Sequence, residues 1–227
     1  MEESPAAAWI SLPWVGMWIS LRRAADLLQT DLGINRESAR IALNAGLAGE
    51  VVRAGGAHLV EDHSVRAVIE RAHRPMGSED SYDAARRAGA FVGRLGPRRA
   101  TPEDDWRPWR GVDLAAPGEE QLLAAAGWWQ VSIPTRVLLT VRAERGDLVP
   151  FIGVVAGLAV VGGEVAGVAG SRPGHDARWL RFDLTPPGPW FEELQGRRIG
   201  PRTGPPWFTW PDGAWSGRAG ALDTIGT

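Results

Sequence analysis

The chain of 227 residues is long enough for one large domain or two small ones. Its net charge of −2 provides no general attraction to nucleic acid or to anionic surfaces, so a nucleic-acid interface would depend on locally placed arginines. There is no cysteine, which excludes disulfide bonds and thiolate metal sites and suits a reducing cytoplasmic location.

The first 17 residues form an apolar arm with Trp9 and Trp14, and a small module is predicted over residues 18–74. The first helix of the module is predicted over Ile19–Leu28, where four apolar residues recur at helical spacing and form one stripe. These residues are Leu21, Ala24, Ala25 and Leu28. Ser20 stands at the position expected for the N-cap of this helix.

A second helix is predicted after Asn35, which serves as its N-cap, and it ends before Gly46, where a left-handed residue commonly closes a helix. Three apolar residues face the first helix: Ala39, Ala42 and Leu43. Four polar residues are then left facing outward: Arg36, Glu37, Ser38 and Arg40.

The segment Val51–Val60 predicts two strands around a Gly55-Gly56 turn, with Arg53 and His58 as the polar residues of the hairpin. Asp62 is expected to cap a third helix over Ser64–Ala72.

This order of elements resembles the excisionase-type, MerR-like winged helix-turn-helix. The resemblance covers residues of about 18–72 and rests on eight positions: Leu21, Ala24, Ala25, Leu28, Gly46, Leu47, Gly55 and Gly56. It implies binding to double-stranded DNA through the second helix and the hairpin, or wing. Carried over by position, the DNA-contact candidates are Arg36, Ser38, Arg40, Arg53 and His58, with Asn35 at the start of the helix. The chain departs from the family in Gln29–Leu32, which is about one helical turn longer than the usual link.

Residues 75–110 are predicted to form a linker and a helix. The linker is placed at Arg74–Ser78, and the helix over Ser78–Arg94. The helix is indicated by the spacing of its apolar residues: Tyr82, Ala85, Ala88, Phe91 and Leu95. Because it joins the two parts of the chain, it is a candidate element for a homodimer.

Residues 111–227 predict a C-terminal domain made mostly of antiparallel strands and rich in tryptophan. A short helix opens at Pro117 and ends near Gly127. The strands are expected over Trp128–Ile133, Val137–Ala143, Phe151–Val161, Glu164–Ala169 and Trp179–Leu184. The tail Thr185–Thr227 is expected to be irregular and to lie over the sheet.

The apolar run Leu148–Ala169 is long enough to span a bilayer. Its valines and glycines favour two buried strands that turn at Gly162-Gly163-Glu164, and no contact with a membrane is predicted.

No catalytic motif, metal-ligand spacing or cofactor fingerprint is present, so the chain is not expected to be an enzyme or to need a cofactor. His175-Asp176 is the nearest approach to a catalytic pair, and its setting favours a solvated turn. The 12 tryptophans could line a ligand pocket or a partner surface, but we favour a role in packing the ends of the sheet.

The sequence therefore predicts an α+β protein with an N-terminal winged helix-turn-helix, followed by a helix and a C-terminal antiparallel, Trp-rich β domain. The predicted function is DNA binding as a transcriptional regulator, with the C-terminal domain used for dimerisation or ligand sensing. The alternative is a protein-interaction or small-ligand-binding module in which the helix-turn-helix is structural.

Overall fold

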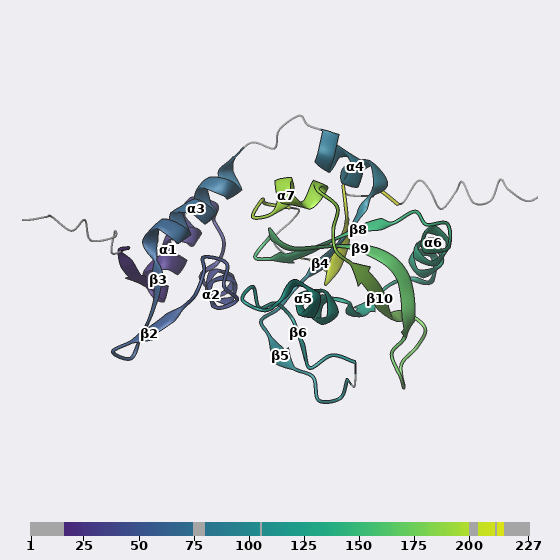
Figure 1. The fold of residues 1–227 in the computed structure, drawn as a ribbon, viewed down its shortest axis with the longest axis horizontal. Helices are drawn as coiled ribbons and strands as arrows, with labels where there is room; N and C mark the ends of the chain where they lie inside the picture. Colours follow the sequence, from purple (N-terminus) through teal and green to yellow (C-terminus); the bar gives the residue numbers. More distant parts are fainter. Residues whose placement is uncertain (1–15, 75–79, 105, 200–203, 212, 216–227) are drawn as a thin grey trace, which may run out of the picture.

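The computed structural model describes residues 16–74, 80–104, 106–199, 204–211 and 213–215. It is a mixed α+β protein in two parts (Figure 1): a small N-terminal module, residues 16–74, and a β-rich part that begins at residue 80. Most of the predicted arm, with Trp9 and Trp14, and the linker residues 75–79 lie outside the described residues.

The N-terminal module has a three-stranded antiparallel sheet in the order β1-β3-β2. Its elements are β1 (Trp18–Ser20), α1 (Leu21–Leu32), α2 (Arg36–Asn44), β2 (Val52–Ala54), β3 (Ala57–Glu61) and α3 (Asp62–His73). The apolar residues predicted for the first two helices are buried, and those of α1 pack with Ala39, Leu43 and α3 in one core. The expectation that Ala42 faces the first helix is wrong, because Ala42 packs in the core of the β-rich part. Both predicted caps are confirmed, since Ser20 Oγ accepts from the Arg23 amide at 3.2 Å and Asn35 Oδ1 from the Ser38 amide at 2.8 Å.

Two further details of the module differ from prediction. The segment Gln29–Leu32 is the last turn of α1 rather than a longer link, and Gly33 ends the helix in the left-handed conformation at φ 55°. Asp62 does not cap α3. It is the first residue of that helix, and its carboxylate accepts from Arg66 Nε at 2.6 Å.

The β-rich part has a six-stranded sheet in the order β11-β4-β8-β9-β10-β7. Its strands, in that order, are Trp207–Trp210, Ala90–Arg94, Val149–Val155, Leu158–Ser171, Trp179–Thr185 and Gly127–Gln130. The prediction of a wholly antiparallel sheet is wrong, because β4 and β8 pair in parallel. The sheet is curled, and Trp207 Nε1 on one edge donates to the Gln130 carbonyl on the other at 2.6 Å.

Both faces of this sheet are covered (Figure 1). On one face lie α4 (Asp80–Ala88) and α7 (Trp190–Leu194), and on the other α5 (Gly118–Ala125) and α6 (Ile133–Glu144). Phe91 on β4 therefore belongs to one core and its neighbours Ala90 and Val92 to the other, as strand geometry requires. A short hairpin of β5 (Arg99–Ala100) and β6 (Trp109–Arg110) stands beside the sheet.

The strand predicted over Val137–Ala143 is wrong, because these residues lie in α6. The start signals outweigh the β-forming valines: Ser132 Oγ accepts from the Thr135 amide at 3.2 Å, and Pro134 lies in the first turn.

The single helix predicted over Ser78–Arg94 is also wrong. The helix ends at Ala88, and Gly89 reverses the chain with φ +77°. Ala90–Arg94 then form β4. The sheet therefore includes the C-terminal end of the segment that was expected to link the two parts, and this end of the candidate dimer element is not available for a dimer contact.

The apolar run Leu148–Ala169 forms two strands as predicted, but the turn falls at Ala156-Gly157 rather than at Gly162-Gly163-Glu164. Gly162 lies inside β9, where the ring of Phe191 packs directly on its backbone and leaves no room for a side chain. No helix within the described ranges is long and apolar enough to cross a membrane. The tail is not wholly irregular, because it supplies α7 and β11.

A buried arginine fixes the loop before β6 to the end of α5. Arg107 is only 2% exposed, and its guanidinium donates to Asp104 Oδ2 at 2.7 Å and to the carbonyls of Ala124 and Gly127. The guanidinium groups of Arg107 and Arg181 lie 4.5 and 4.9 Å from the ring centre of Trp106. This loop tryptophan therefore packs against two positively charged side chains.

Candidate nucleic-acid interface

All three helices of the N-terminal module point their C-terminal ends at the β-rich part. At each end a donor from the β-rich part satisfies a backbone carbonyl that the helix itself leaves unpaired. At the end of α1 the Arg198 guanidinium donates to the Leu32 carbonyl at 3.1 Å, and at the end of α2 the Leu114 amide donates to the Ala45 carbonyl at 2.8 Å. At the end of α3 the Arg197 guanidinium donates to the Arg74 carbonyl. The module is thus fixed through its C-terminal helix ends, and the first turns of α1 and α2 lie away from this contact.

These two first turns and the hairpin enclose an open groove of about 630 Å³, which we call the basic groove. It is lined by Ser20, Leu21, Arg22, Arg36, Arg40, Ala57 and His58. Three arginines from two helices therefore share one surface with a histidine of the hairpin.

Strand register explains how the hairpin contributes to this groove. Arg53 and His58 are cross-strand partners, and His58 shares its face of β3 with Val60, which is buried against the helices. Arg53 and His58 thus project on the side of the hairpin that carries the helices. In Figure 1 the hairpin extends beyond α1 and α2, so this side is open at its tip.

The structure brings together only some of the candidate residues. Arg36, Arg40 and His58 line the groove, and Arg53 lies opposite His58. Asn35 and Ser38 do not line it, and the Asn35 side chain instead caps α2 by accepting from the Ser38 amide.

Sequence reasoning did not select Arg22, which lies in the first turn of α1 and lines the groove. The signal was present in the sequence, because the Ser20 cap places the residue two positions later at an exposed helix start.

Carboxylates hold two of the groove arginines. Arg36 Nη2 lies 2.6 Å from Asp26 Oδ1, and Arg40 Nη1 lies 3.5 Å from Glu37 Oε2. The arginine side chains remain 46% and 55% exposed, so these pairs are weak and can exchange for other anions. A phosphate that approached the groove would compete with both carboxylates.

A role of the basic groove in DNA binding predicts that removal of the Asp26 charge strengthens that binding. Asp26→Asn frees the Arg36 guanidinium and removes a negative charge beside it, so the affinity for duplex DNA should rise about two- to fivefold. Fluorescence anisotropy with a labelled duplex would measure the change. Asp31→Asn, which removes an exposed charge at the other end of α1, should leave the affinity nearly unchanged. Equal gains in the two variants would show a general charge effect and contradict a specific role of Arg36.

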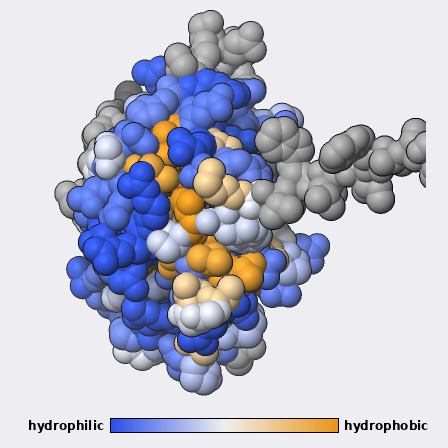
Figure 2. Space-filling view, turned by 90° about the vertical axis from the view of Figure 1, so that its left-hand side faces the viewer, coloured by the Kyte–Doolittle hydropathy of each residue, from blue (hydrophilic) through white to orange (hydrophobic). Residues whose placement is uncertain are grey.

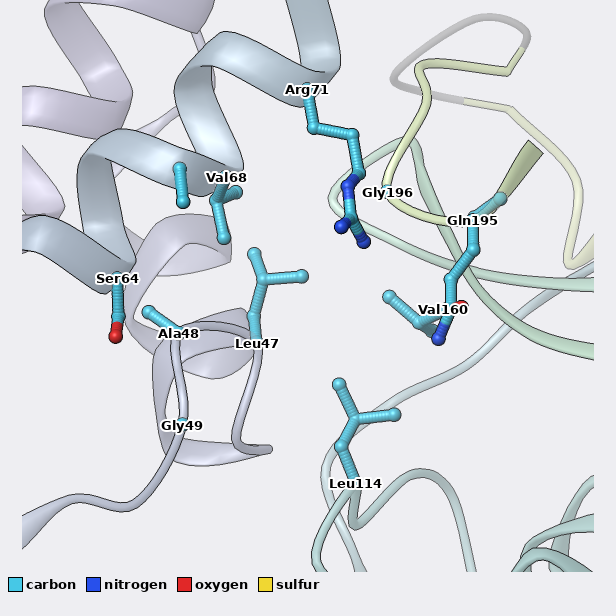
Figure 3. Close-up of a pocket in the computed structure, with 12 residues that line it drawn as sticks. Leu47, Ala48, Gly49, Ser64, Val68, Arg71, Leu114, Val160, Gln195 and Gly196 are labelled. Carbon is cyan, nitrogen blue, oxygen red and sulfur yellow. The ribbon is translucent and has the colours of Figure 1, made fainter. Parts of the chain in front are cut away.

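A second, smaller cavity of about 280 Å³ lies where the module meets the β-rich part. Figure 3 shows Arg71 of α3 pointing into it, opposite Val160 and Gln195. The stem of Arg71 packs on Gly196, where an added Cβ would lie 2.6 Å from Arg71 Cδ. The cavity is lined mainly by small and apolar residues, as expected for the contact of two packed parts. Within the described ranges, no three histidine or carboxylate side chains gather as metal ligands do.

The side of the molecule that carries the module is mostly hydrophilic, with a strip of hydrophobic residues across it (Figure 2). The large apolar side chains of the module that are most exposed, among the described residues, are Met17 at 70% and Trp18 at 40%. Neither lines the basic groove, so the polar groove and these apolar groups are separate features of the surface.

Comparison of the chain with protein-family models, with curated proteins and with solved structures finds no match. The case for a function therefore depends on the geometry of the chain itself.

Proposed function

We propose that the N-terminal module is a winged helix-turn-helix that binds double-stranded DNA and that the protein is a transcriptional regulator. In this proposal α2 enters the major groove, with Arg36 and Arg40 toward the bases and phosphates, and the β2–β3 hairpin is the wing. Arg22 grips a backbone phosphate from the start of α1.

The observation that carries the proposal is the basic groove itself. A helix pair alone is a common packing device, but packing does not require three arginines from two helix starts to share a surface with the polar side of a hairpin. Helix N-termini also favour anions, and both α1 and α2 begin at this groove.

The β-rich part holds the module by its three C-terminal helix ends and is proposed to carry dimerisation or ligand sensing. Helix-turn-helix proteins commonly act as dimers that read two half-sites, so a second copy is the expected protein partner.

The competing proposal is a protein-interaction or ligand-binding module in which the two helices are structural. It is favoured by the carboxylates of Asp26 and Glu37, which partly neutralise the groove. The two proposals differ in whether a DNA phosphate can replace the carboxylates of Asp26 and Glu37 as the partner of the groove arginines.

Selection from a random-sequence duplex pool at low salt tests the proposal. We expect recovery of a common sequence motif, which is symmetric if two copies bind together. A pool with no enrichment at low salt would contradict DNA binding and would favour the interaction module.

A further inference from the structure

A cleft of about 420 Å³ lies between β7, the end of β4 and the β5–β6 hairpin. Its volume is in the range of small-molecule sites in proteins. Three tryptophans and three arginines line it: Trp128, Trp129, Trp179, Arg94, Arg99 and Arg110. No aspartate or glutamate of the described chain is among its lining residues. The cleft therefore combines positive charge with aromatic surface.

Two of its arginines, Arg99 and Arg110, lie close enough to repel each other. Arg99 and Arg110 are direct cross-strand partners on the β5–β6 hairpin, and like charges in this arrangement destabilise a hairpin. Both are exposed, and neither side chain has an ion pair or a side-chain hydrogen bond to another described residue. The neighbouring Arg98 differs, because it lies 2.5 Å from Asp113 Oδ2 and over the ring of Trp109.

Two of the three tryptophans in the cleft are held by hydrogen bonds from their indole N–H groups. The indole N–H of Trp128 donates to Asp104 Oδ1 at 3.0 Å, and that of Trp129 donates to the Ala125 carbonyl at 2.9 Å. Trp129 is buried, whereas Trp128 and Trp179 are half-buried, so parts of their rings reach the surface. The ring of Trp179 lies beside His175, with 5.5 Å between ring centres, and the Arg172 guanidinium lies 5.7 Å from its centre. A flat ring can therefore lie against the exposed parts of Trp128 and Trp179, beside the two arginines.

We propose that this cleft binds a small aromatic phosphate of mononucleotide size. The phosphate lies between Arg99 and Arg110, and the ring lies against Trp128 and Trp179. A phosphate monoester carries nearly two negative charges at neutral pH and so matches two guanidinium groups, whereas a carboxylate carries one. Aromatic rings stack well on tryptophan, independently of their exact substituents. The cleft shares no lining residue with the basic groove and does not depend on DNA binding.

Calorimetric titration of the full chain tests this site with adenosine monophosphate, adenosine and inorganic phosphate as probes. Adenosine monophosphate should bind at least about tenfold more tightly than either fragment, because only it engages both halves of the cleft. Phenyl phosphate should also bind more tightly than benzoate. Fragments that bind as well as adenosine monophosphate would overturn the proposal, and so would tighter binding of benzoate.

The variant Arg99→Gln/Arg110→Gln should bind adenosine monophosphate at least about tenfold more weakly than the unaltered chain. It should unfold at the same temperature or higher, because a repulsive pair is removed. The control Arg86→Gln/Arg145→Gln removes two exposed arginines on α4 and at the end of α6, and it should keep the affinity. Equal affinity in the two variants would overturn the proposal.

The affinity for duplex DNA separates this site from the proposed function. Arg99→Gln/Arg110→Gln should keep that affinity, so absence of nucleotide binding and absence of DNA binding are observed independently. A loss of duplex affinity in this variant would instead assign the hairpin arginines to a DNA surface and overturn the proposal.

Discussion

The double variant Arg36→Gln/Arg40→Gln is expected to bind its selected duplex on the order of 100-fold more weakly than the unaltered chain, since two specific arginine contacts contribute about 1–3 kcal/mol each. Both side chains are exposed at the start of α2, and their only side-chain partners among the described residues are surface carboxylates. The fold should therefore be unaffected. Fluorescence anisotropy at fixed salt would measure the affinity, and circular dichroism would check the fold.

The control for this variant is Arg86→Gln/Arg145→Gln, which changes the net charge equally in the β-rich part. It should lose little affinity for the duplex, because its arginines lie outside the basic groove. Equal losses in the two double variants would mean that only overall charge matters, and α2 would then not be the DNA-reading helix.

The largest effect on stability is expected for Asp104→Ala. This change leaves the Arg107 guanidinium buried without its carboxylate, and the unfolding free energy should fall by about 3–5 kcal/mol. We expect the lower end of this range, because Arg107 keeps its bonds to the carbonyls of Ala124 and Gly127. Urea denaturation followed by tryptophan fluorescence would measure the loss.

Asp176→Ala provides the comparison, because it breaks an ion pair with Arg178 in which both side chains are about half exposed. Water and salt screen such a pair, so the loss of stability should be much smaller. Similar losses in the two variants would contradict the view that the buried Arg107 holds this loop in place.

The same carboxylate should make stability depend on acid. Burial raises the pKa of the Asp104 carboxyl, but the hydrogen bonds from Trp128 and Arg107 and the charge of Arg107 outweigh it, so the pKa lies below its ordinary value of 3.8. Its contribution is thus present above that value and is lost as the pH falls through the lower pKa of the folded state. The stability gap between the unaltered chain and Asp104→Asn should hold from pH 7 down to about pH 4 and then narrow as the pH falls further. A constant gap would contradict this.

The sequence predicts the N-terminal module closely because its signals are local. The caps Ser20 and Asn35, the stripes at helical spacing and the Gly-Gly turn each act within a few residues, and the structure has them; the cap predicted at Asp62 is the exception. The groove was only partly predictable. Arg36, Arg40 and His58 follow from local pattern. The Ser20 cap also places Arg22 at an exposed helix start, but its position beside the hairpin depends on the tertiary fold.

The β-rich part could be predicted only in outline because its decisive contacts are distant in sequence. Trp207–Trp210 forms a strand only because β4, more than 100 residues earlier, offers an edge. Gly162 signals a turn locally, but it is in fact the place where Phe191 approaches the backbone. Val137–Ala143 has the composition of a strand, and only the cap and the proline before it indicate a helix.

The salt dependence of duplex binding is the measurement we would make first on the selected sequence. The logarithm of the affinity of the unaltered chain should fall linearly with the logarithm of salt concentration, as phosphate contacts release counterions. In Arg36→Gln/Arg40→Gln the slope should be shallower by about one for each phosphate that the variant no longer neutralises. Binding that is insensitive to salt, or a slope that the variant leaves unchanged, would contradict the assignment of the basic groove to DNA.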